Sequence, residues 1–341
     1  MSQPTDLSAF SKLVYPALRE ELQKATAPAA DHSTPGLLEM ITYQLGWTGE
    51  NAGPKAEGKQ LRAVLTLLAC EAAGGEWRSA LPAAAAVELL HNFSLIHDDI
   101  EDLGETRRGR PTVWVIWGKA QAINTGDAMF SLANMALLNL ADTVSTKAAL
   151  QAEALFHTTC LRLTQGQYLD ISFEGQSQVE LETYWKMVGG KTAALLAFCL
   201  QAGALAGGAD LELQEHYRDF GHYLGLAFQV QDDILGIWGE EGQTGKSSTD
   251  DLVTRKKTLP VLYGIAQKKE FYRIWSEDEI TPKKAIQLAE ILQVEGGRAY
   301  AQNTAERLTD LALDALEKAG PQGNAGEILE KLPQNLLQRS N

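Results

Sequence analysis

Apolar residues recur at spacings of three and four along most of the chain, as they do in helices that bury one face. Ala, Leu, Glu, Lys and Gln, which all favour helices, fill most of these stretches. Alternating apolar and polar runs of the kind found in strands are scarce. The pattern predicts helices over residues 13–24, 61–73, 81–102, 125–140, 146–169, 181–206, 211–238, 282–294 and 298–319.

Short stretches rich in Gly, Pro, Ser, Thr and Asp separate the predicted helices. None of them resembles a long flexible linker. We therefore expect one all-α domain over residues 1–341, a single large bundle of about ten or more helices. The breaks between helices are expected at residues 26–36, 46–58, 103–112, 239–250 and 320–326.

The composition of the 341 residues, 45% hydrophobic and 22% charged, is that of a soluble globular protein. Acidic residues outnumber basic ones by 44 to 30, and the net charge of −14 argues against binding to nucleic acid or an anionic membrane. The three cysteines show no paired spacing, and the N-terminus does not look like a secretion signal, so we expect a cytoplasmic protein. The most apolar stretch, residues 192–208, contains Gln201 and is expected to be a buried core helix without membrane insertion.

Two acidic clusters end predicted helices. In the first, SLIHDDIED, Asp98 and Asp102 lie about 40° apart on one helix face. In the second, FQVQDDILG, Asp232 and Asp233 end another apolar run. A lone acidic helix end is usually solvated surface, but two carboxylate clusters without a His and Cys ligand set suggest magnesium bridging to phosphate.

Basic residues occur in short groups near these clusters, and guanidinium groups in a glycine-containing loop match phosphate oxygens well. Carboxylates that could hold a metal, together with separate cations that could hold phosphate, indicate a diphosphate ligand. The groups are Lys59 with Arg62, then Arg107 with Arg108 and Arg110, then Lys191, and then Lys246 with Lys256.

The motifs in their order resemble the trans-type isoprenyl diphosphate synthases of the polyprenyl synthetase family, over residues of about 37 to 264. They are GKQLR (58–62), HNFSLIHDDIED (91–102) with RRGRPT (107–112), GGKT (189–192), FQVQDD (228–233), and TGK (244–246) with KKTLP (256–260). The resemblance implies a helical fold around an apolar cavity, a homodimer, and condensation of isopentenyl diphosphate with an allylic diphosphate. It also implies three bound magnesium ions.

The resemblance assigns roles to individual residues, and each group is named by its expected ligand. The residues expected to hold magnesium are Asp98, Asp102, Asp232 and Asp233. Those expected to bind the allylic diphosphate are Arg107, Lys191, Lys246 and Lys256. Those expected to bind isopentenyl diphosphate are Lys59, Arg62, His91 and Arg108. Those expected beside the reacting carbons, where they stabilise an allylic cation, are Thr192 and Gln229.

The sequence departs from the family pattern in two places. Gly236 stands where the second acidic motif often has a third aspartate. Gln60 and Ala63 replace an arginine and a proline around Lys59 and Arg62. The first departure leaves the third metal on Asp232, with Asp233 as a second candidate ligand and water completing its coordination.

The resemblance also gives a chain-limiting role to the position five residues before the first aspartate, which is Phe93 here and is followed by the small Ser94. In the family that this sequence resembles, a second aromatic residue at the next position accompanies shorter products, so Phe93 with Ser94 favours the twenty-carbon geranylgeranyl diphosphate over farnesyl diphosphate. Two further alternatives are open: a class I terpene cyclase, which would leave the isopentenyl diphosphate ligands without a purpose, and a non-catalytic partner subunit of a prenyl synthase.

Overall fold

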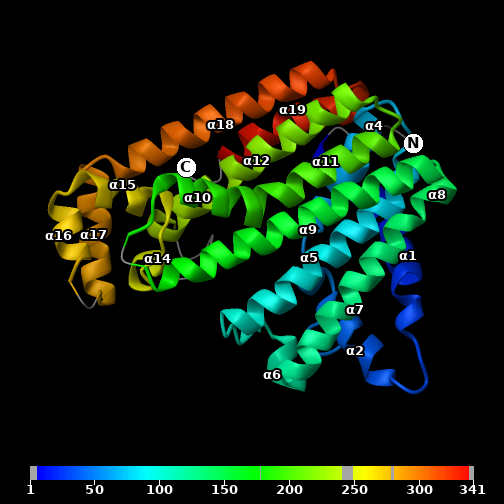
Figure 1. Cartoon of the computed structure of the whole chain (residues 1–341), viewed down its shortest axis with the longest axis horizontal. Coiled ribbons are helices and arrows are strands. Elements are labelled where there is room, and N and C mark those ends of the chain that lie inside the picture. The colour runs from blue at the N-terminus through cyan, green and yellow to red at the C-terminus, as the bar shows by residue number, and fades with distance from the viewer. Residues whose placement is uncertain (1–5, 177, 240–248, 278–279, 338–341) are drawn as a thin grey trace. The chain divides into compact units, whose positions relative to one another are not determined.

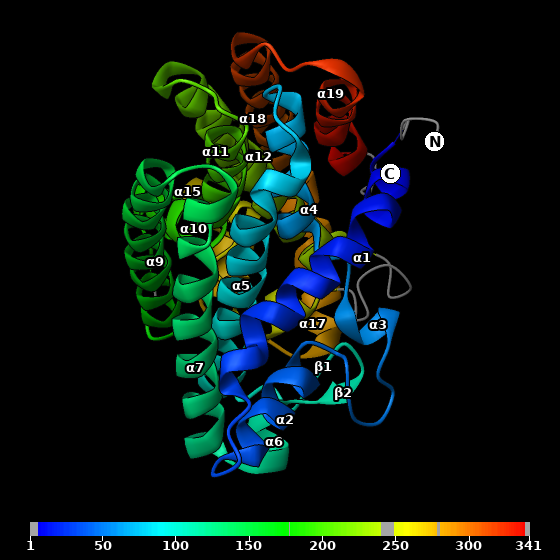
Figure 2. The same cartoon turned by 90° about the vertical axis from the view of Figure 1, so that its right-hand side faces the viewer.

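The computed structural model describes residues 6–176, 178–239, 249–277 and 280–337, and Figures 1 and 2 show almost all of them as helices. The chain divides into two compact units. The first unit comprises Met1–Phe156, Cys199–Gln214 and Pro321–Ile328. The second comprises His157–Phe198, Glu215–Gly320 and Leu329–Asn341. The prediction of a single domain over the whole chain stays a prediction.

The first unit is built mainly on the N-terminal helices. They are α1 (Leu7–Thr26), α2 (Pro35–Gln44), α3 (Pro54–Glu57), α4 (Leu61–Ala72), α5 (Leu81–Glu101), α6 (Val113–Trp117), α7 (Lys119–Leu138) and α8 (Leu140–Thr143), with single 3-10 turns at Ala27–Ala29 and Trp77–Ala80. Four helices contribute to both units: α9 (Thr146–Glu174), α11 (Ala194–Ala206), α12 (Leu211–Trp238) and α19 (Gly323–Leu337).

Helix α5 is the centre of the first unit. Every residue from Pro82 to Leu90 is buried, and α5 lies along α7 and α1 (Figure 2). Helix α4 also packs closely against α11. A Cβ at Gly203 of α11 would come within 2.2 Å of the carbonyl oxygen of Thr66 of α4. Small residues thus allow close contact between these backbones, and the large aliphatic side chains fill the spaces that remain.

A short hairpin follows α5. Strand β1 (Thr106–Arg107) pairs antiparallel with β2 (Arg110–Pro111), and Arg107 is opposite Arg110. The two turn residues, Arg108 and Gly109, both have positive φ, as a two-residue hairpin turn of type I′ requires. The sequence pattern predicted only a break here, because two-residue strands leave no alternation to detect.

The second unit contains α10 (Leu181–Val188), α14 (Asp250–Val253), α15 (Leu259–Gln267), α16 (Glu270–Trp275), α17 (Pro282–Val294) and α18 (Gly297–Ala319). One apolar cluster joins α10, α12, α15 and α18 around Tyr184, Val230 and Leu259. Another joins α14, α16 and α17 around Phe271 and Leu288.

A π-helical turn, Gly189–Ala193, interrupts the predicted helix 181–206 between α10 and α11. This turn packs closely against α9, where a Cβ at Gly166 would come within 2.1 Å of the amide nitrogen of Lys191. Such turns often occur at functional sites, and this one carries the GGKT motif.

The all-α prediction is confirmed, and all nine predicted helices occur, most with shifted ends and one with the π-helical interruption. The pattern missed α2, α15 and α19 together with several single turns. Two described helical stretches, Trp77–Glu101 and Leu181–Ala206, are long and apolar enough to cross a membrane. Most of each stretch is buried within the protein, as in core helices of soluble proteins.

Candidate active site

The first acidic motif closes α5. The amide of Asp102 donates to the carbonyl oxygen of Asp98 at 2.8 Å, so these residues are one turn apart on the same face. Asp98 is half-buried, and Asp102, the C-terminal cap, is exposed. Negative charge at a helix C-terminus is unfavourable, so a bound cation would relieve this arrangement.

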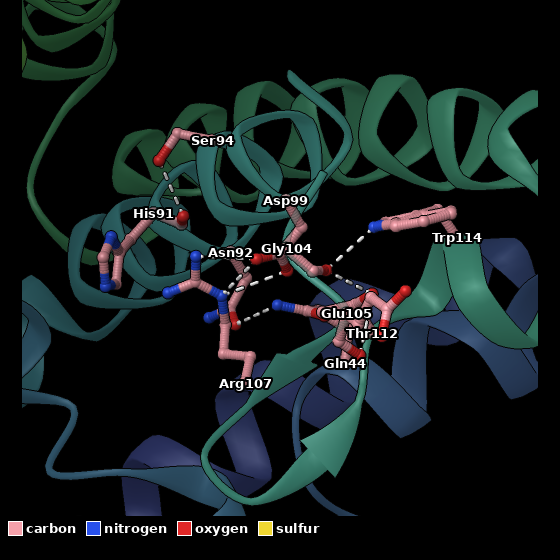
Figure 3. Close-up of polar contacts among 10 residues, drawn as sticks. All are labelled: Gln44, His91, Asn92, Ser94, Asp99, Gly104, Glu105, Arg107, Thr112 and Trp114. Carbon is pink, nitrogen blue, oxygen red and sulfur yellow. Dashed lines mark hydrogen bonds and ion pairs between the residues drawn. The ribbon is translucent and has the colours of Figure 1, made fainter. Parts of the chain in front are cut away.

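Asp99 anchors Arg107. The Nε of Arg107 donates to both carboxylate oxygens of Asp99 at 2.9 and 3.0 Å, and its Nη2 lies 2.8 Å from Oδ1 (Figure 3). Burial raises the pKa of Asp99, and the hydrogen bond and charge of Arg107 oppose that shift. Asp99 thereby orients the guanidinium group that the sequence analysis assigned to the allylic diphosphate.

The loop between α5 and α6 is tied to the same helix end. The carbonyl oxygen of Gly104 accepts hydrogen bonds from Thr112 Oγ1 and Trp114 Nε1, both at 2.9 Å (Figure 3). The amide of Gly104 donates to the carbonyl oxygen of Asp99 at 2.9 Å. These bonds fix the hairpin relative to the first acidic motif.

Three of the residues predicted for isopentenyl diphosphate interact with one another. Arg62 Nη1 lies 3.3 Å from His91 Nε2. Because arginine can only donate, that nitrogen of His91 accepts, and the imidazole is neutral. Burial, together with the charges of Arg62, Arg108 and Arg107, holds the pKa of His91 well below its usual range.

Arg108 is held by backbone. Its Nη1 donates to the carbonyl oxygens of Ala56 and Glu57, both at 2.8 Å. A Cβ at Gly58, where φ is +73°, would come within 2.7 Å of Arg108 Cζ. Only glycine leaves room for the guanidinium group here.

The fourth predicted residue, Lys59, is exposed in the loop before α4. Tyr15 Oη of α1 donates to the carbonyl oxygen of Lys59 at 2.6 Å. Gln60, which replaces the family's arginine, has a φ of +43° and forms the N-terminal cap of α4. The loop therefore presents Lys59 and Arg62 at a helix N-terminus, where negative charge is favoured.

The two carboxylates of the second acidic motif lie in different environments. Asp232 is exposed, whereas Asp233 is 2% exposed. Asp233 Oδ2 accepts from Tyr184 Oη at 2.6 Å and from the amide of Leu259 at 2.8 Å, and Oδ1 accepts from Gln229 Nε2 at 3.1 Å. Burial raises the pKa of Asp233, while Lys256 and these hydrogen bonds oppose the shift. These three donors fix the Asp233 carboxylate and connect it to Gln229, and its predicted role as a magnesium ligand stays a prediction.

Thr192 and Gln229 are in direct contact. Thr192 Oγ1, in the π-helical turn, donates to Gln229 Oε1 of α12 at 2.8 Å. The bond from Gln229 Nε2 to Asp233 fixes the orientation of the amide. The hydroxyl proton of Thr192 is therefore engaged, and its oxygen can act only as an acceptor toward a further group.

Lys191 pairs with Asp170 at 2.6 Å from Nζ to Oδ2. Partial burial acts to lower the pKa of Lys256, but the carboxylates of Asp251, Asp233 and Asp170 raise it above its usual value. Lys246 lies outside the described residues.

A carboxylate stands beside Gly236. A Cβ at Gly236 would come within 2.0 Å of Asp251 Oδ2. The carboxylate of Asp251 thus occupies the space that a side chain at position 236 would take.

Phe93 and Ser94 lie in different surroundings. The ring centroid of Phe93 is 5.3 Å from that of Phe130 on α7, and the ring of Phe130 stacks 6.1 Å from that of Phe156. Ser94 Oγ donates to the carbonyl oxygen of His91 at 2.8 Å (Figure 3). A row of three aromatic rings therefore begins at Phe93.

The donor set fits a hard cation that shares its coordination with a substrate. Within the described parts of the chain, no group of three or more His, Cys, Asp or Glu could hold a metal ion by itself. Magnesium commonly takes one or two carboxylates and completes its coordination with phosphate oxygens and water. Asp98 and Asp102 supply such a pair of carboxylates.

Three residues that orient the others were not predicted from the sequence pattern: Asp99, Asp170 and Tyr184. Asp170 lies four residues after Gly166, on the face of α9 that contacts the π-helical turn. That helical spacing was available in the sequence, but the contact between α9 and the GGKT motif was not. Tyr184 had no local signal, because its partner Asp233 is 49 residues away.

Comparison with known proteins places the chain in a family. Residues 51–292 match the model of the polyprenyl synthetase family. The (2E,6E)-farnesyl diphosphate synthase of Mycobacterium tuberculosis (strain ATCC 25618 / H37Rv) is 39% identical, covering 98% of this chain and 92% of that protein. The geranylgeranyl diphosphate synthase of the same strain is 40% identical, covering 83% of this chain and 82% of that one.

Among solved structures, the polyprenyl synthetase of Streptomyces coelicolor A3(2) matches with a TM-score of 0.85 and 34% identity, covering 97% of this chain and 99% of that one. The geranylgeranyl pyrophosphate synthetase of Pyrococcus horikoshii Ot3 matches with a TM-score of 0.85 and 30% identity, covering 97% and 98%. The resemblance inferred from the five motif regions is confirmed, and the chain belongs to the polyprenyl synthetase family of prenyltransferases.

Proposed function

We propose that this short-chain trans-prenyl diphosphate synthase adds isopentenyl diphosphate to an allylic diphosphate until it has made the twenty-carbon geranylgeranyl diphosphate. The observation that carries the product length is the pair Phe93 and Ser94. Phe93 supplies one aromatic ring before the first acidic motif, and the next position holds only a small hydroxyl side chain. One ring leaves more room for a chain than two would.

The basic residues divide between the two diphosphates. Arg62, Arg108 and Lys59 bind isopentenyl diphosphate, which keeps its diphosphate through the reaction. Arg107 and Lys191 bind the allylic diphosphate, each oriented by a carboxylate, Asp99 or Asp170. Lys246 and Lys256 are proposed as further contacts to the allylic diphosphate.

Magnesium, when bound through Asp98, Asp102 and Asp232, supplies positive charge to the leaving diphosphate. We propose three such ions, as the family resemblance implies. Asp233 completes the second motif by holding Gln229 in place.

The reaction breaks the allylic carbon–oxygen bond, and its electron pair leaves with the diphosphate. The double bond of isopentenyl diphosphate forms the new carbon–carbon bond, and a proton then passes to the released diphosphate. The oxygen of Thr192, whose proton is donated to Gln229, presents its lone pairs to the allylic cation. Bound substrate and apolar surroundings exclude water, which would quench that cation.

Farnesyl diphosphate is the second candidate product, favoured by the 39% identity to a farnesyl diphosphate synthase over 98% of this chain. Purified protein should be incubated with magnesium, isopentenyl diphosphate and each allylic primer, and the products separated by chain length. A twenty-carbon product supports the proposal, and a product that stops at fifteen carbons overturns it. No condensation at all would exclude an active synthase.

We also propose a homodimer, with a second copy covering an apolar surface of the first unit. Helix α7 exposes Ile123, Met135 and Leu138, and the start of α9 exposes Leu150. Large apolar side chains left exposed are typical of surfaces that a protein partner covers. Light scattering should give twice the chain mass of 37.1 kDa, and Leu138→Glu should lower it to that of the monomer.

A further inference from the structure

One buried acid has no role in the reaction described above. Glu88 lies in the middle of α5 and is only 2% exposed. Its neighbours Val87 and Leu89 are fully buried. A carboxylate is seldom buried unless other groups compensate its charge, so its surroundings indicate what it does.

Hydrogen bonds satisfy only part of the Glu88 carboxylate. Oε1 accepts from Asn92 Nδ2 at 2.9 Å. Asn92 Oδ1 in turn accepts from Gln44 Nε2 at 3.3 Å (Figure 3). Oε2 is buried without a hydrogen-bond partner in the part of the chain that the structure describes. The remaining compensation must come from charge.

The opposite charges that act on Glu88 are those of Arg108 and Arg62. Burial raises the pKa of Glu88, and both guanidinium groups oppose that shift. The two arginines repel each other, and Arg62 contributes to the lowered pKa of Arg108 after burial and Arg107. Glu88 also lies three residues before His91 on the same face of α5, and His91 Nε2 is 3.3 Å from Arg62 Nη1, so the buried carboxylate and the guanidinium group of Arg62 belong to one cluster of groups.

We propose that Glu88 is a positioning residue of the isopentenyl diphosphate site, whose negative charge holds the guanidinium groups of Arg62 and Arg108 in the arrangement that receives the diphosphate. This inference rests on the proposed function. It differs from a general role in stability because its effect is confined to one of the two substrates.

The test is Glu88→Gln, which keeps the shape and removes the charge. Glu71→Gln is the matched control, because Glu71 is a half-buried carboxylate of the same unit whose pKa is also raised by burial. We expect Glu88→Gln to raise the KM for isopentenyl diphosphate about tenfold. The KM for the allylic primer should stay within about twofold of wild type, and Glu71→Gln should leave both unchanged. Calorimetric titration with isopentenyl diphosphate alone should show the same weakening without catalysis.

An unchanged KM for isopentenyl diphosphate, or an equal rise for both substrates, overturns the inference. If circular dichroism shows that Glu88→Gln is unfolded, Glu88→Asp takes its place, since it keeps the charge and withdraws it by one methylene. That variant should again weaken isopentenyl diphosphate selectively, and a uniform effect overturns the inference. A wild-type protein that does not condense the substrates refutes the proposed function, and titration of wild type and variant with inorganic diphosphate then still tests the role of Glu88 in anion binding.

Discussion

Removing one hydroxyl group from Tyr184 tests how the second acidic motif is held. Tyr184 is 1% exposed, and its Oη donates to Asp233 Oδ2 at 2.6 Å. Tyr184→Phe would leave Asp233 with one donor fewer in a site where water cannot replace it. Hydrogen bonds to charged groups contribute about 1.5–3 kcal/mol, so the free energy of unfolding should fall by about 2 kcal/mol.

The same unit offers a matched control. Tyr217 is fully buried, and its Oη has no hydrogen-bond partner among the described residues. Tyr217→Phe removes an unsatisfied polar group, so it should be neutral or stabilising. Each variant removes one buried phenolic hydroxyl group. The hydroxyl of Tyr184 has a hydrogen-bond partner, and that of Tyr217 has none among the described residues.

Urea unfolding followed by circular dichroism measures both variants, with the urea midpoint compared at equal slope. Condensation activity is measured in parallel, because a looser Asp233 would release Gln229 from its fixed orientation. We expect Tyr184→Phe to lose both stability and turnover and Tyr217→Phe to lose neither. Equal midpoints for the two variants would refute the idea that Asp233 depends on Tyr184.

Three further changes test other parts of the site. Asp98→Ala should abolish condensation without loss of thermal stability, because it removes a metal ligand and a like-charge repulsion; activity assays and thermal unfolding check this, and near-normal turnover would contradict it. Gly58→Ala should raise the KM for isopentenyl diphosphate about tenfold or more, because the new methyl group displaces Arg108. Steady-state kinetics with each substrate varied measure this effect, and an unchanged KM would contradict the prediction. His91→Gln should reduce the loss of stability between about pH 7 and 5. Because the pKa of His91 is lowered in the folded protein, the unfolded chain binds a proton in this range that the folded protein does not bind. Urea midpoints across the range measure the effect, and parallel curves for both proteins would contradict it.

Sequence reasoning predicted the helices well because their faces carry a local period. The predicted C-terminal end of α5 is within one residue of the observed end. Both predicted ends of α12 and of α17 match the observed ends. It missed α15, which begins at Leu259 directly after Thr258 and is only nine residues long, and the hairpin at Arg107 and Arg110, since neither is long enough to establish a period. The acidic and basic motifs could also be recognised in the sequence, because the residues of each motif follow one another along the chain.

Most of the contacts that orient those motifs were not visible, because they join residues far apart in the sequence. Thr192 and Gln229 are 37 residues apart, and Arg108 is 52 residues from the carbonyl of Ala56. The family resemblance placed the first pair beside the reacting carbons, and the structure adds the bond between them. The role proposed for Glu88 needed burial, which no charge pattern shows.

Glycine explains how an acidic protein places charged groups so closely. A Cβ at Gly58 would meet the guanidinium group of Arg108, and one at Gly166 would meet the backbone of Lys191. At each position the missing side chain leaves space for a cation or its backbone, and a carbonyl or carboxylate beside that space then fixes it. These glycines therefore influence the electrostatics of the site, because they determine how closely each cation lies to the oxygen atom that holds it. An alanine at either position would change no charge, yet it should move a cation away from its proposed diphosphate ligand.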